Sequence, residues 1–434
     1  MDWLVALTLF GSFFLMLILG VPISFSIGIA ALLSIAVVLP FDAALSVVSQ
    51  KLASGLDSFT LLAIPFFVLA GNIMNRGGIA MRLIDFSKLL AGRLPGSLAH
   101  VNVIANMLFG SISGSAVAAA AAVGGTMSPL QKKEGYDPVF STSVNITSCP
   151  AGLLIPPSNA FIVYSLISGG TSIGALFLAG YLPGLLMGLS VMVVAAIIAK
   201  RNDYPVAPRI NASQALTVTL RALPSLGLIV VIMGGIVGGV FTATEASAVA
   251  VVYSFFLAFI CYRDVSFKEL PNIILESLVT ASMIMLLIGA SMAMAWAMAN
   301  ADIPFMISDL LLAVSENPII VLLIINLILL IVGVFMDMTP ALLIFTPIFL
   351  PVAQDLGMDP VHFGVMITFN LCIGICTPPV GSALFVGCSV SGVKIEKVIK
   401  PLLPFFFVLL ATLMLVTFVP QVSLFLPQQL LGYY

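Results

Sequence analysis

Long apolar stretches separated by short polar segments run along almost the whole chain. Each of the following is long enough to cross a bilayer, which takes a helix of about 20 residues. They cover approximately residues 3–19, 22–39, 58–75, 139–167, 172–199, 217–240, 244–262, 275–299, 361–390 and 399–420. The pattern therefore predicts an all-α polytopic membrane protein, with a first span at the N-terminus and not a cleaved signal.

Two further apolar stretches, about 97–133 and 318–353, are interrupted midway by small or polar residues. The first contains Gly110-Ser-Ile-Ser-Gly-Ser115, and the second contains Asp337, Thr339 and Pro340. A helix that crosses the bilayer does not need such an interruption, whereas a re-entrant hairpin does. Irregular backbone at membrane depth is tolerated only where it is buried in protein or lines a cavity. We therefore expect two re-entrant helical hairpins.

Two of the ordinary spans are broken at consecutive prolines. The span at about 139–167 contains Pro156-Pro157, and the span at about 361–390 contains Pro378-Pro379. Such pairs remove two backbone donors and push the preceding residue out of the helical conformation. A kinked helix without a ligand explains one such break equally well. The second copy favours a paired site made of discontinuous helices.

The irregular features of the first half recur in the second half in one constant register. Gly135, Asp137-Pro138, Gly152 and Pro156-Pro157 coincide with Gly357, Asp359-Pro360, Gly374 and Pro378-Pro379 when the first half is shifted along the chain. Two apolar segments share Leu and Ile because of their composition alone, but composition does not explain shared Gly, Asp-Pro and Pro-Pro at equivalent positions. The sequence predicts two repeats, 1–216 and 217–434. An odd number of crossings lies between an element and its copy, so the second repeat is expected to be inverted.

Basic residues give the expected orientation. The predicted crossings place all but Lys51 of the 16 Lys and Arg residues on one face. By the positive-inside rule this face is cytoplasmic. Both termini are then expected outside, with the first hairpin entering from the cytoplasm and the second from outside.

Composition supports the membrane class and excludes others. The chain is 61% hydrophobic and 8% charged, with a mean hydropathy of +1.22, whereas soluble domains carry about 25% charged residues. Few cations argue against nucleic acid as a partner. Cys372 and Cys376 lack a neighbouring His and are expected to be buried small apolar residues. His100 and His362 are predicted near opposite faces, so neither a metal centre nor an enzyme is expected.

Inverted repeats with broken helices at equivalent positions indicate the midplane site of a secondary transporter. Half-helix N-termini suit a carboxylate and free carbonyls suit Na⁺. Oxygens of Ser111, Ser113 and Ser115 are expected to face Gly152–Asn159, while Asp337 and Thr339 face Thr377. The alternatives are a structural carboxyl for Asp337 and close helix packing for the serines, the reading that we favour for Ala116–Ala122. Glu245, after Thr242, predicts a capping arrangement.

These motifs resemble those of a known family. The residues at 110–116, Ile155-Pro-Pro-Ser158, the run at 239–246 and Cys376-Thr-Pro-Pro379 resemble the large membrane subunit of tripartite ATP-independent periplasmic (TRAP) transporters, and the resemblance covers essentially the whole chain. It implies Na⁺-coupled import of an organic anion (a C4-dicarboxylate, sugar acid or sialic acid) across the bacterial inner membrane by an elevator mechanism. It also implies a periplasmic binding protein, a small four-helix membrane subunit as a separate chain, and no cofactor besides Na⁺. The termini, expected outside from the charge pattern, would then be periplasmic.

The same resemblance implies two sodium sites with the substrate between them. The residues expected to bind the ions are Ser111, Ser113, Gly114, Ser115, Gly152, Ile155, Pro156, Ser158, Gly333, Asp337, Thr339, Gly374, Thr377, Pro378 and Gly381. The residues expected to contact substrate are Ser115, Asn159, Thr339 and Ser382. No Lys or Arg falls in either broken segment, so selection is expected to rest largely with the binding protein. The alternative is a stand-alone ion-coupled carboxylate transporter or antiporter of the same architecture.

Overall fold

The computed structural model describes residues 2–92, 94–206 and 211–433, and within them it contains helices and no strands. The first half comprises α1 (Asp2–Ile18), α2 (Ile23–Ala36), α3 (Phe41–Leu56), η1 (Phe59–Leu62), α4 (Ala63–Arg76), α5 (Ile79–Ala91), α6 (Ser97–Ser113), α7 (Ala116–Lys133), α8 (Pro138–Ser148), α9 (Ala151–Leu154), α10 (Asn159–Ile167) and α11 (Ile173–Arg201). The second half comprises α12 (Ala212–Val237), α13 (Ala243–Phe255), η2 (Phe256–Cys261), η3 (Phe267–Glu269), α14 (Leu270–Asn300), α15 (Ile303–Val314), α16 (Pro318–Phe335), α17 (Met338–Asp355), α18 (Pro360–Gly374), α19 (Ser382–Ser391), α20 (Ile395–Phe418) and α21 (Pro420–Leu431).

The described residues form eight helices that are long and apolar enough to cross a membrane, or up to nine if the bent pair Pro138–Leu154 and Asn159–Ile167 counts as one span. This confirms a polytopic membrane protein. The span predicted at 22–39 is shorter than expected, because α2 begins after Pro22 and ends at Ala36. Helices α16 and α17 are among the eight by length and composition, yet they form one hairpin.

Four helices were not predicted from the apolar pattern: α3, α5, α15 and α21. They have 16, 13, 12 and 12 residues, which at 1.5 Å per residue is too short to cross about 30 Å of hydrocarbon. Helices α3 and α5 also carry charged residues, such as Lys51 and Arg82. A search for long apolar runs passes over helices of this kind.

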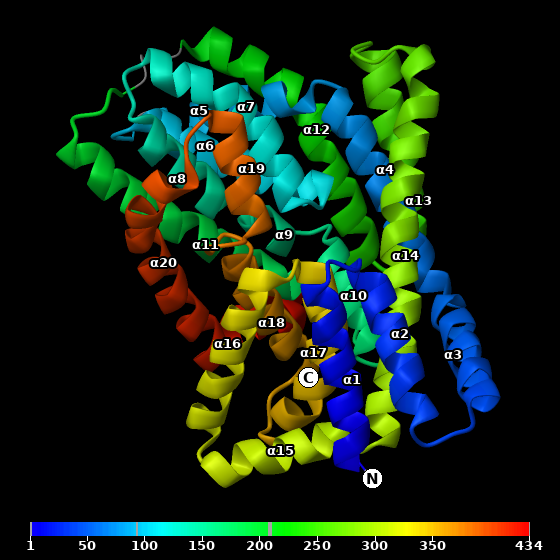
Figure 1. The fold of residues 1–434 in the computed structure, drawn as a ribbon. Coiled ribbons are helices and arrows are strands. Elements are labelled where there is room, and N and C mark those ends of the chain that lie inside the picture. The colour runs from blue at the N-terminus through cyan, green and yellow to red at the C-terminus, as the bar shows by residue number, and fades with distance from the viewer. Residues whose placement is uncertain (1, 93, 207–210, 434) are drawn as a thin grey trace.

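Both hairpins form within the predicted bounds. Helices α6 and α7 turn at Gly114, which adopts a left-handed φ of 62°, and α16 and α17 turn at Met336–Asp337. The first hairpin occupies the upper half of the molecule in Figure 1 and the second occupies the lower half. The tips therefore approach the centre from opposite ends, as an inverted repeat requires.

The register between the two halves is visible in the structure. Helix α7 covers 116–133 and α17 covers 338–355, and Asp137 and Asp359 each accept a hydrogen bond from the backbone N–H two residues later. Cys372 Sγ lies 3.7 Å from the carbonyl oxygen of Pro150, its own counterpart in that register. The two broken helices therefore cross at equivalent residues, where a pseudo-twofold axis between the halves would pass.

The broken helices form the centre of the molecule. Every residue from Phe140 to Ser148 in α8 and from Val361 to Gly374 in α18 is buried. Around this centre, α14 packs against α2, α3 and α4, while α4 packs against α13. We call α2, α4, α13 and α14 the frame helices, because they stand to one side of the hairpins and the broken helices (Figure 1).

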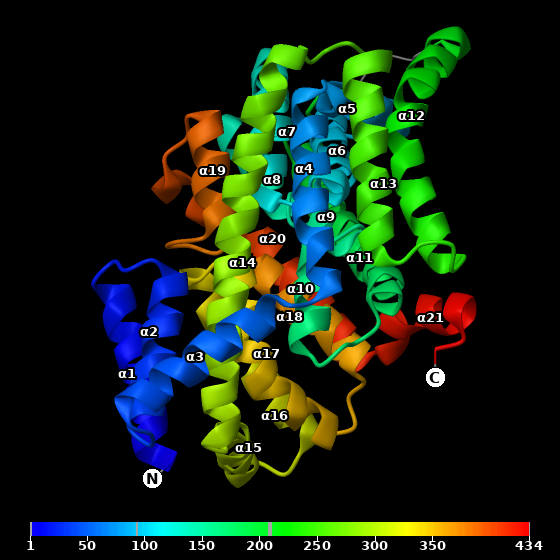
Figure 2. The same ribbon diagram turned by 90° about the vertical axis from the view of Figure 1, so that its right-hand side faces the viewer.

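The basic loops and the termini lie at opposite ends. The loops α4–α5, α7–α8 and α13–α14 lie in the upper half of Figure 2, and both termini lie in the lower half. Arg93 and Arg209, two of the basic residues counted toward this face, lie outside the described residues. The three named loops lie at the end of the molecule opposite the termini, in agreement with the predicted separation of charge.

Candidate transport site

A cavity of about 770 Å³ lies where the two hairpin tips meet the frame helices. This volume is within the usual range for small-molecule sites, about 300–1,000 Å³. Tip residues Ser113, Ser115, Asp337 and Thr339 line it from the two hairpins. The hairpins, far apart in sequence, therefore share one cavity.

The first tip is neutral and rich in hydroxyl groups. The Gly114 N–H closes α6 by donating to the Gly110 carbonyl oxygen at 2.8 Å. Ser115 then begins α7 as its N-cap, and its Oγ accepts from the Ala118 N–H at 3.2 Å. Ser113 Oγ donates to the Ser115 carbonyl oxygen at 3.4 Å. Lone pairs of both hydroxyl oxygens remain for a ligand in the cavity.

The first tip is held by close backbone contact with the first broken helix. A Cβ on Gly152 would lie 2.5 Å from Gly110 Cα, so only glycine fits. The whole segment 151–158, which contains Gly152, is buried. Within it, Ser158 Oγ is buried without a hydrogen-bond partner among the described residues. A buried polar oxygen of this kind normally has a partner, which fits a ligand-binding position.

The second tip repeats this arrangement with a charged group. Asp337 is the N-cap residue of α17 but makes no capping hydrogen bond with its side chain. Its Oδ1 instead accepts from Ser382 Oγ, at 3.1 Å, at the start of α19. Gly333 and Gly374 meet as Gly110 and Gly152 do, since a Cβ on Gly374 would lie 2.6 Å from Gly333 Cα.

Asp337 lies at the turn of the predicted re-entrant hairpin, and its side chain is exposed to the cavity. The sequence pattern predicted that it faces Thr377 and its neighbours, and the side-chain contact in the structure is with Ser382. The Thr377 hydroxyl donates to the Ile373 carbonyl oxygen at 2.8 Å. Asp337 reaches Ser382 because α19 starts beyond the proline break and points its first residue at the tip.

Seven predicted site residues line the cavity and the others lie behind it. The lining residues are Ser113, Gly114, Ser115, Asn159, Asp337, Thr339 and Ser382, which include all four predicted substrate contacts. The residues that do not line it are Ser111, Gly152, Ile155, Pro156, Ser158, Gly333, Gly374, Thr377, Pro378 and Gly381. Ser111, for example, donates to the Leu108 carbonyl oxygen at 2.9 Å. Sequence spacing locates the breaks but does not tell which side faces the cavity.

The frame helices supply polar groups that sequence reasoning missed. Ser24 of α2, Asn72 and Asn75 of α4 and Thr280 of α14 line the cavity. The available signal was the pair of asparagines about one turn apart near the end of the apolar stretch at 58–75. Two amides there are a reason to expect a polar face on that helix.

Buried asparagines join each hairpin to its broken helix and were also missed. Asn106 Nδ2 donates to Asn145 Oδ1 at 3.0 Å and to Ser148 Oγ at 2.8 Å. In the second repeat Asn370 Nδ2 donates to Asn326 Oδ1 at 2.8 Å. Hydrogen bonds between buried side chains fix the relative position of two helices, so these amides position the tips.

Three other hypotheses from the sequence are confirmed. Glu245 and Thr242 form a capping box at the start of α13. Cys372 and Cys376 are buried among apolar side chains. Ala116, Ala119 and Ala120 are buried in the α7 interface, as the packing interpretation of the alanine run requires. His100 and His362 are both buried, and the Nε2 of each lies within hydrogen-bond distance of a backbone carbonyl oxygen, that of Pro95 at 3.1 Å and that of Val416 at 2.7 Å.

Paired hairpins with tips at one central cavity, within a bundle of membrane-spanning helices, define the chain as a membrane transporter of the secondary class. The chain belongs to the family described as "Tripartite ATP-independent periplasmic transporter, DctM component", whose model matches residues 10–422. The resemblance inferred from the sequence motifs is confirmed, and the chain is a transporter subunit and not an enzyme.

Relatives match over nearly the whole chain. An uncharacterized protein, YgiK of Salmonella typhimurium, is 63% identical over 97% of this chain and 97% of its own. The sialic acid TRAP transporter large permease SiaM of Vibrio cholerae is 39% identical over 96% and 97%. The C4-dicarboxylate TRAP transporter large permease DctM of Pseudomonas aeruginosa is 42% identical over 88% and 89%.

Among solved structures, the Alcanivorax borkumensis YdaH transporter, described as having an unusual topology, resembles this chain with a TM-score of 0.61. It is 12% identical and the match covers 86% of this chain and 88% of that one. The similarity extends to the fold alone.

Proposed function

We propose that this chain is the large membrane subunit of a Na⁺-coupled tripartite transporter that imports an organic anion. The observation that carries the proposal is the shared cavity. It is lined by hydroxyl groups from both tips, by amides of α4 and α10 and by one carboxylate, Asp337. The names of the relatives, which specify sialic acid and C4-dicarboxylates, support carboxylate substrates, including sugar acids.

Two sodium sites are proposed behind the tips. The first lies between Ser113–Ser115 and the buried segment 152–158, where Ser158 Oγ has no partner among the described residues. The second lies between 333–339 and 374–381, where Asp337 and Ser382 meet. Apart from Ser111, which precedes the first tip, the residues proposed to bind ions that do not line the cavity lie within the segments 152–158, 333–339 and 374–381. Neutral oxygens and one carboxylate suit a hard monovalent cation, and an ion there would bridge each hairpin to its broken helix.

An elevator movement is the proposed mechanism. The hairpins and broken helices are held together by glycine contacts and buried amides. The cavity lies between the tips and α2, α4 and α14, and α4 touches the first tip where Gly71 meets the Ser113 backbone. A rigid core that slides against the frame helices would carry the cavity across the membrane without dismantling either ion site. The two repeats, 1–216 and 217–434, each contribute one hairpin to this core.

The proposed orientation places the basic loops in the cytoplasm and both termini in the periplasm of a bacterial inner membrane, as the positive-inside rule favours. The proposed partners are a periplasmic binding protein, which delivers the anion, and a small four-helix membrane subunit. The described lining of the cavity contains no Lys or Arg, which supports a binding protein as the main source of substrate selection.

Reconstituted uptake tests this function. Proteoliposomes that contain both membrane subunits are supplied with the purified binding protein, and labelled succinate, N-acetylneuraminate and a sugar acid are offered in turn. Uptake of one of them should require both the binding protein and an inward Na⁺ gradient. Uptake driven by pH alone would contradict the sodium assignment, and uptake without the binding protein would favour a stand-alone carboxylate transporter.

A further inference from the structure

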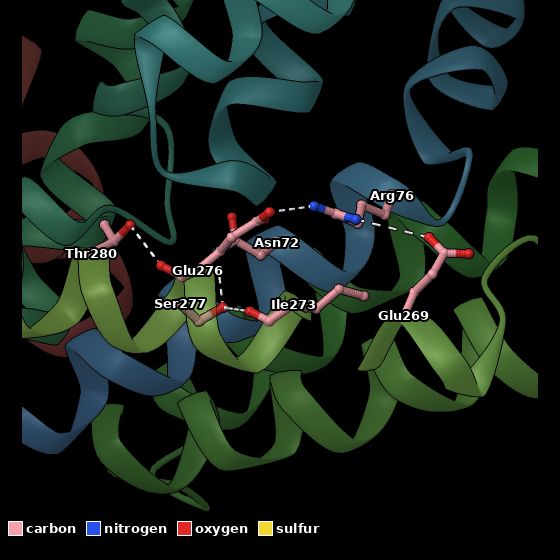
Figure 3. Close-up of polar contacts among 7 residues, drawn as sticks. All are labelled: Asn72, Arg76, Glu269, Ile273, Glu276, Ser277 and Thr280. Atoms are coloured by element: carbon pink, nitrogen blue, oxygen red, sulfur yellow. Dashed lines mark hydrogen bonds and ion pairs between the residues drawn. The ribbon is translucent and has the colours of Figure 1, made fainter. Parts of the chain in front are cut away.

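Two polar pairs join the frame helices α4 and α14, one at the cavity and one just beyond it. Asn72 and Asn75 of α4 line the cavity, and so does Thr280 of α14. In the first pair Asn72 Nδ2 donates to Ser277 Oγ at 2.8 Å. In the second, one helical turn further on, Arg76 pairs with Glu276 at 2.5 Å (Figure 3).

Arg76 is held between two carboxylates without being enclosed. Its Nη1 lies 3.8 Å from Glu269 Oε2, in addition to the Glu276 contact. The Arg76 side chain is 36% exposed and that of Glu276 is 55% exposed. A guanidinium has five N–H donors, so two carboxylate contacts leave donors for a third group.

The position of this cation is unusual relative to the cavity. The described lining contains a carboxylate, Asp337, and no Lys or Arg, so an anion inside has no side-chain cation. Arg76 directly follows the lining residue Asn75, and Thr280 Oγ1 donates to the Glu276 carbonyl oxygen at 3.0 Å. Arg76 also lies one helical turn after the lining residue Asn72, and Glu276 lies one turn before the lining residue Thr280. The pair therefore continues the face of α4 and α14 that lines the cavity, and an anion that leaves along this face meets Arg76 just beyond the lining.

We infer that Arg76 and Glu276 form a carboxylate-exchange site at the mouth of the cavity, where the carboxylate of an organic anion replaces Glu276 on Arg76. Arginine binds carboxylates with paired N–H donors. An exposed ion pair contributes little to stability, so opening it costs little. Glu276 then competes for the guanidinium and limits how long the anion stays. This inference rests on the proposed function, since it assumes that the cargo carries a carboxylate.

The alternative role for the pair is a brace between α4 and α14. The two roles predict opposite effects of Glu276→Gln. A brace is weakened both by Arg76→Gln and by Glu276→Gln. In an exchange site, Arg76→Gln removes anion binding, whereas Glu276→Gln strengthens it by removing the competing carboxylate.

A thiol-protection assay distinguishes them without requiring transport. Asn75→Cys, next to Arg76, serves as the reporter in a chain with Cys261→Ser, because Cys261 is the exposed cysteine among the five. The purified chain is labelled with N-ethylmaleimide in the presence of succinate or N-acetylneuraminate, with chloride at equal ionic strength as the reference. Ser213→Cys, an exposed position on α12, is the matched control and should be insensitive.

With Arg76 present, one carboxylate should slow labelling about 3-fold, as expected for an exposed ionic contact. Arg76→Gln should abolish the slowing, Arg76→Lys should retain part of it, and Glu276→Gln should increase it. Equal loss in Arg76→Gln and Glu276→Gln, or no slowing by either carboxylate, would overturn the inference. Protection of the reporter, combined with no uptake of any offered anion in the presence of the binding protein, would contradict the proposed transport function and leave the exchange site supported.

Discussion

The two hairpin tips occupy equivalent places in the repeat but differ in the residue that begins the second helix of the hairpin. Ser115 and Asp337 are counterparts in the register of the repeat, and each is the N-cap of the second hairpin helix. Ser115 uses its oxygen to cap α7, whereas Asp337 leaves α17 without a side-chain cap and accepts from Ser382. The comparison shows that two copies of one architecture can use the same position differently. Ser115 stabilises its helix, whereas Asp337 supplies a charge to the cavity.

Both tips share a close backbone contact that leaves no room for a side chain. Each hairpin meets its broken helix through a pair of glycines, Gly110 with Gly152 and Gly333 with Gly374. The backbones approach to a distance that excludes a Cβ. The difference in charge is therefore added to a common contact and does not come from a different fold.

The largest expected effect is at the charged tip. Asp337→Asn keeps the shape of the side chain and removes its charge, so Na⁺-driven uptake in proteoliposomes should fall about 100-fold, or about 2.7 kcal/mol. Asp355→Asn, the same change at the exposed far end of α17, is the matched control and should transport normally. Uptake by Asp337→Asn at the rate of the control would show that the charge of this tip is not used.

The glycine contacts should be equally sensitive in both repeats. Gly152→Ala and Gly374→Ala each place a Cβ against the backbone of the facing helix, and we expect a loss of about 2 kcal/mol of stability. The measurement is the thermal unfolding midpoint in detergent. Gly125→Ala, where a Cβ would lie 3.6 Å from Val390 Cγ1, is the control. A shift for only one of the two variants would show that the repeats are not held in the same way.

A smaller effect is expected at the neutral tip. Ser113→Ala removes one hydroxyl oxygen, and the Na⁺ concentration for half-maximal uptake should rise about 5-fold, as for the loss of about 1 kcal/mol. Ser213→Ala on the exposed surface of α12 controls for general effects of the change. An unchanged sodium dependence would leave Ser113 with a packing role.

The smallest effect is expected for the cap. Ser115→Ala removes the oxygen that accepts from the Ala118 N–H, and the free energy of unfolding should fall by about 1 kcal/mol. Ser115→Asp retains a capping oxygen and should recover most of this loss. If Asp337→Ala lowers stability by as much as Ser115→Ala, then the capping difference between the tips is not real.

The positions of the hairpins and breaks could be predicted because residues within a few positions along the chain cause both. The proline pairs interrupt helices wherever they occur, and Asp137 and Asp359 cap α8 and α18 with their own carboxylates. The recurrence of these features in one register then linked the two halves without any knowledge of contacts. Helix ends were predicted less well where polar residues extend the helix, as at the start of α14, which begins at Leu270 and not near 275.

The frame side of the cavity could not be predicted in the same way. Asn72, Asn75 and Thr280 lie in helices that the apolar pattern describes correctly as spans. Their common orientation depends on how α4 packs against α14, which is a contact between segments far apart in the chain. The pairing of Arg76 with Glu276 is hidden from the sequence for the same reason.

The sequence by itself determined the class of the protein, its repeat and the residues at its breaks, because hydropathy, prolines, glycines and caps act within a few residues of chain. Only the tertiary structure decided which of those residues meet. It placed Asp337 against Ser382 at the cavity and Ser111 behind it, and it closed the cavity with α2, α4 and α14. These decisions depend on backbone approach and helix orientation across long separations in sequence, and the pattern of single residues does not contain that information.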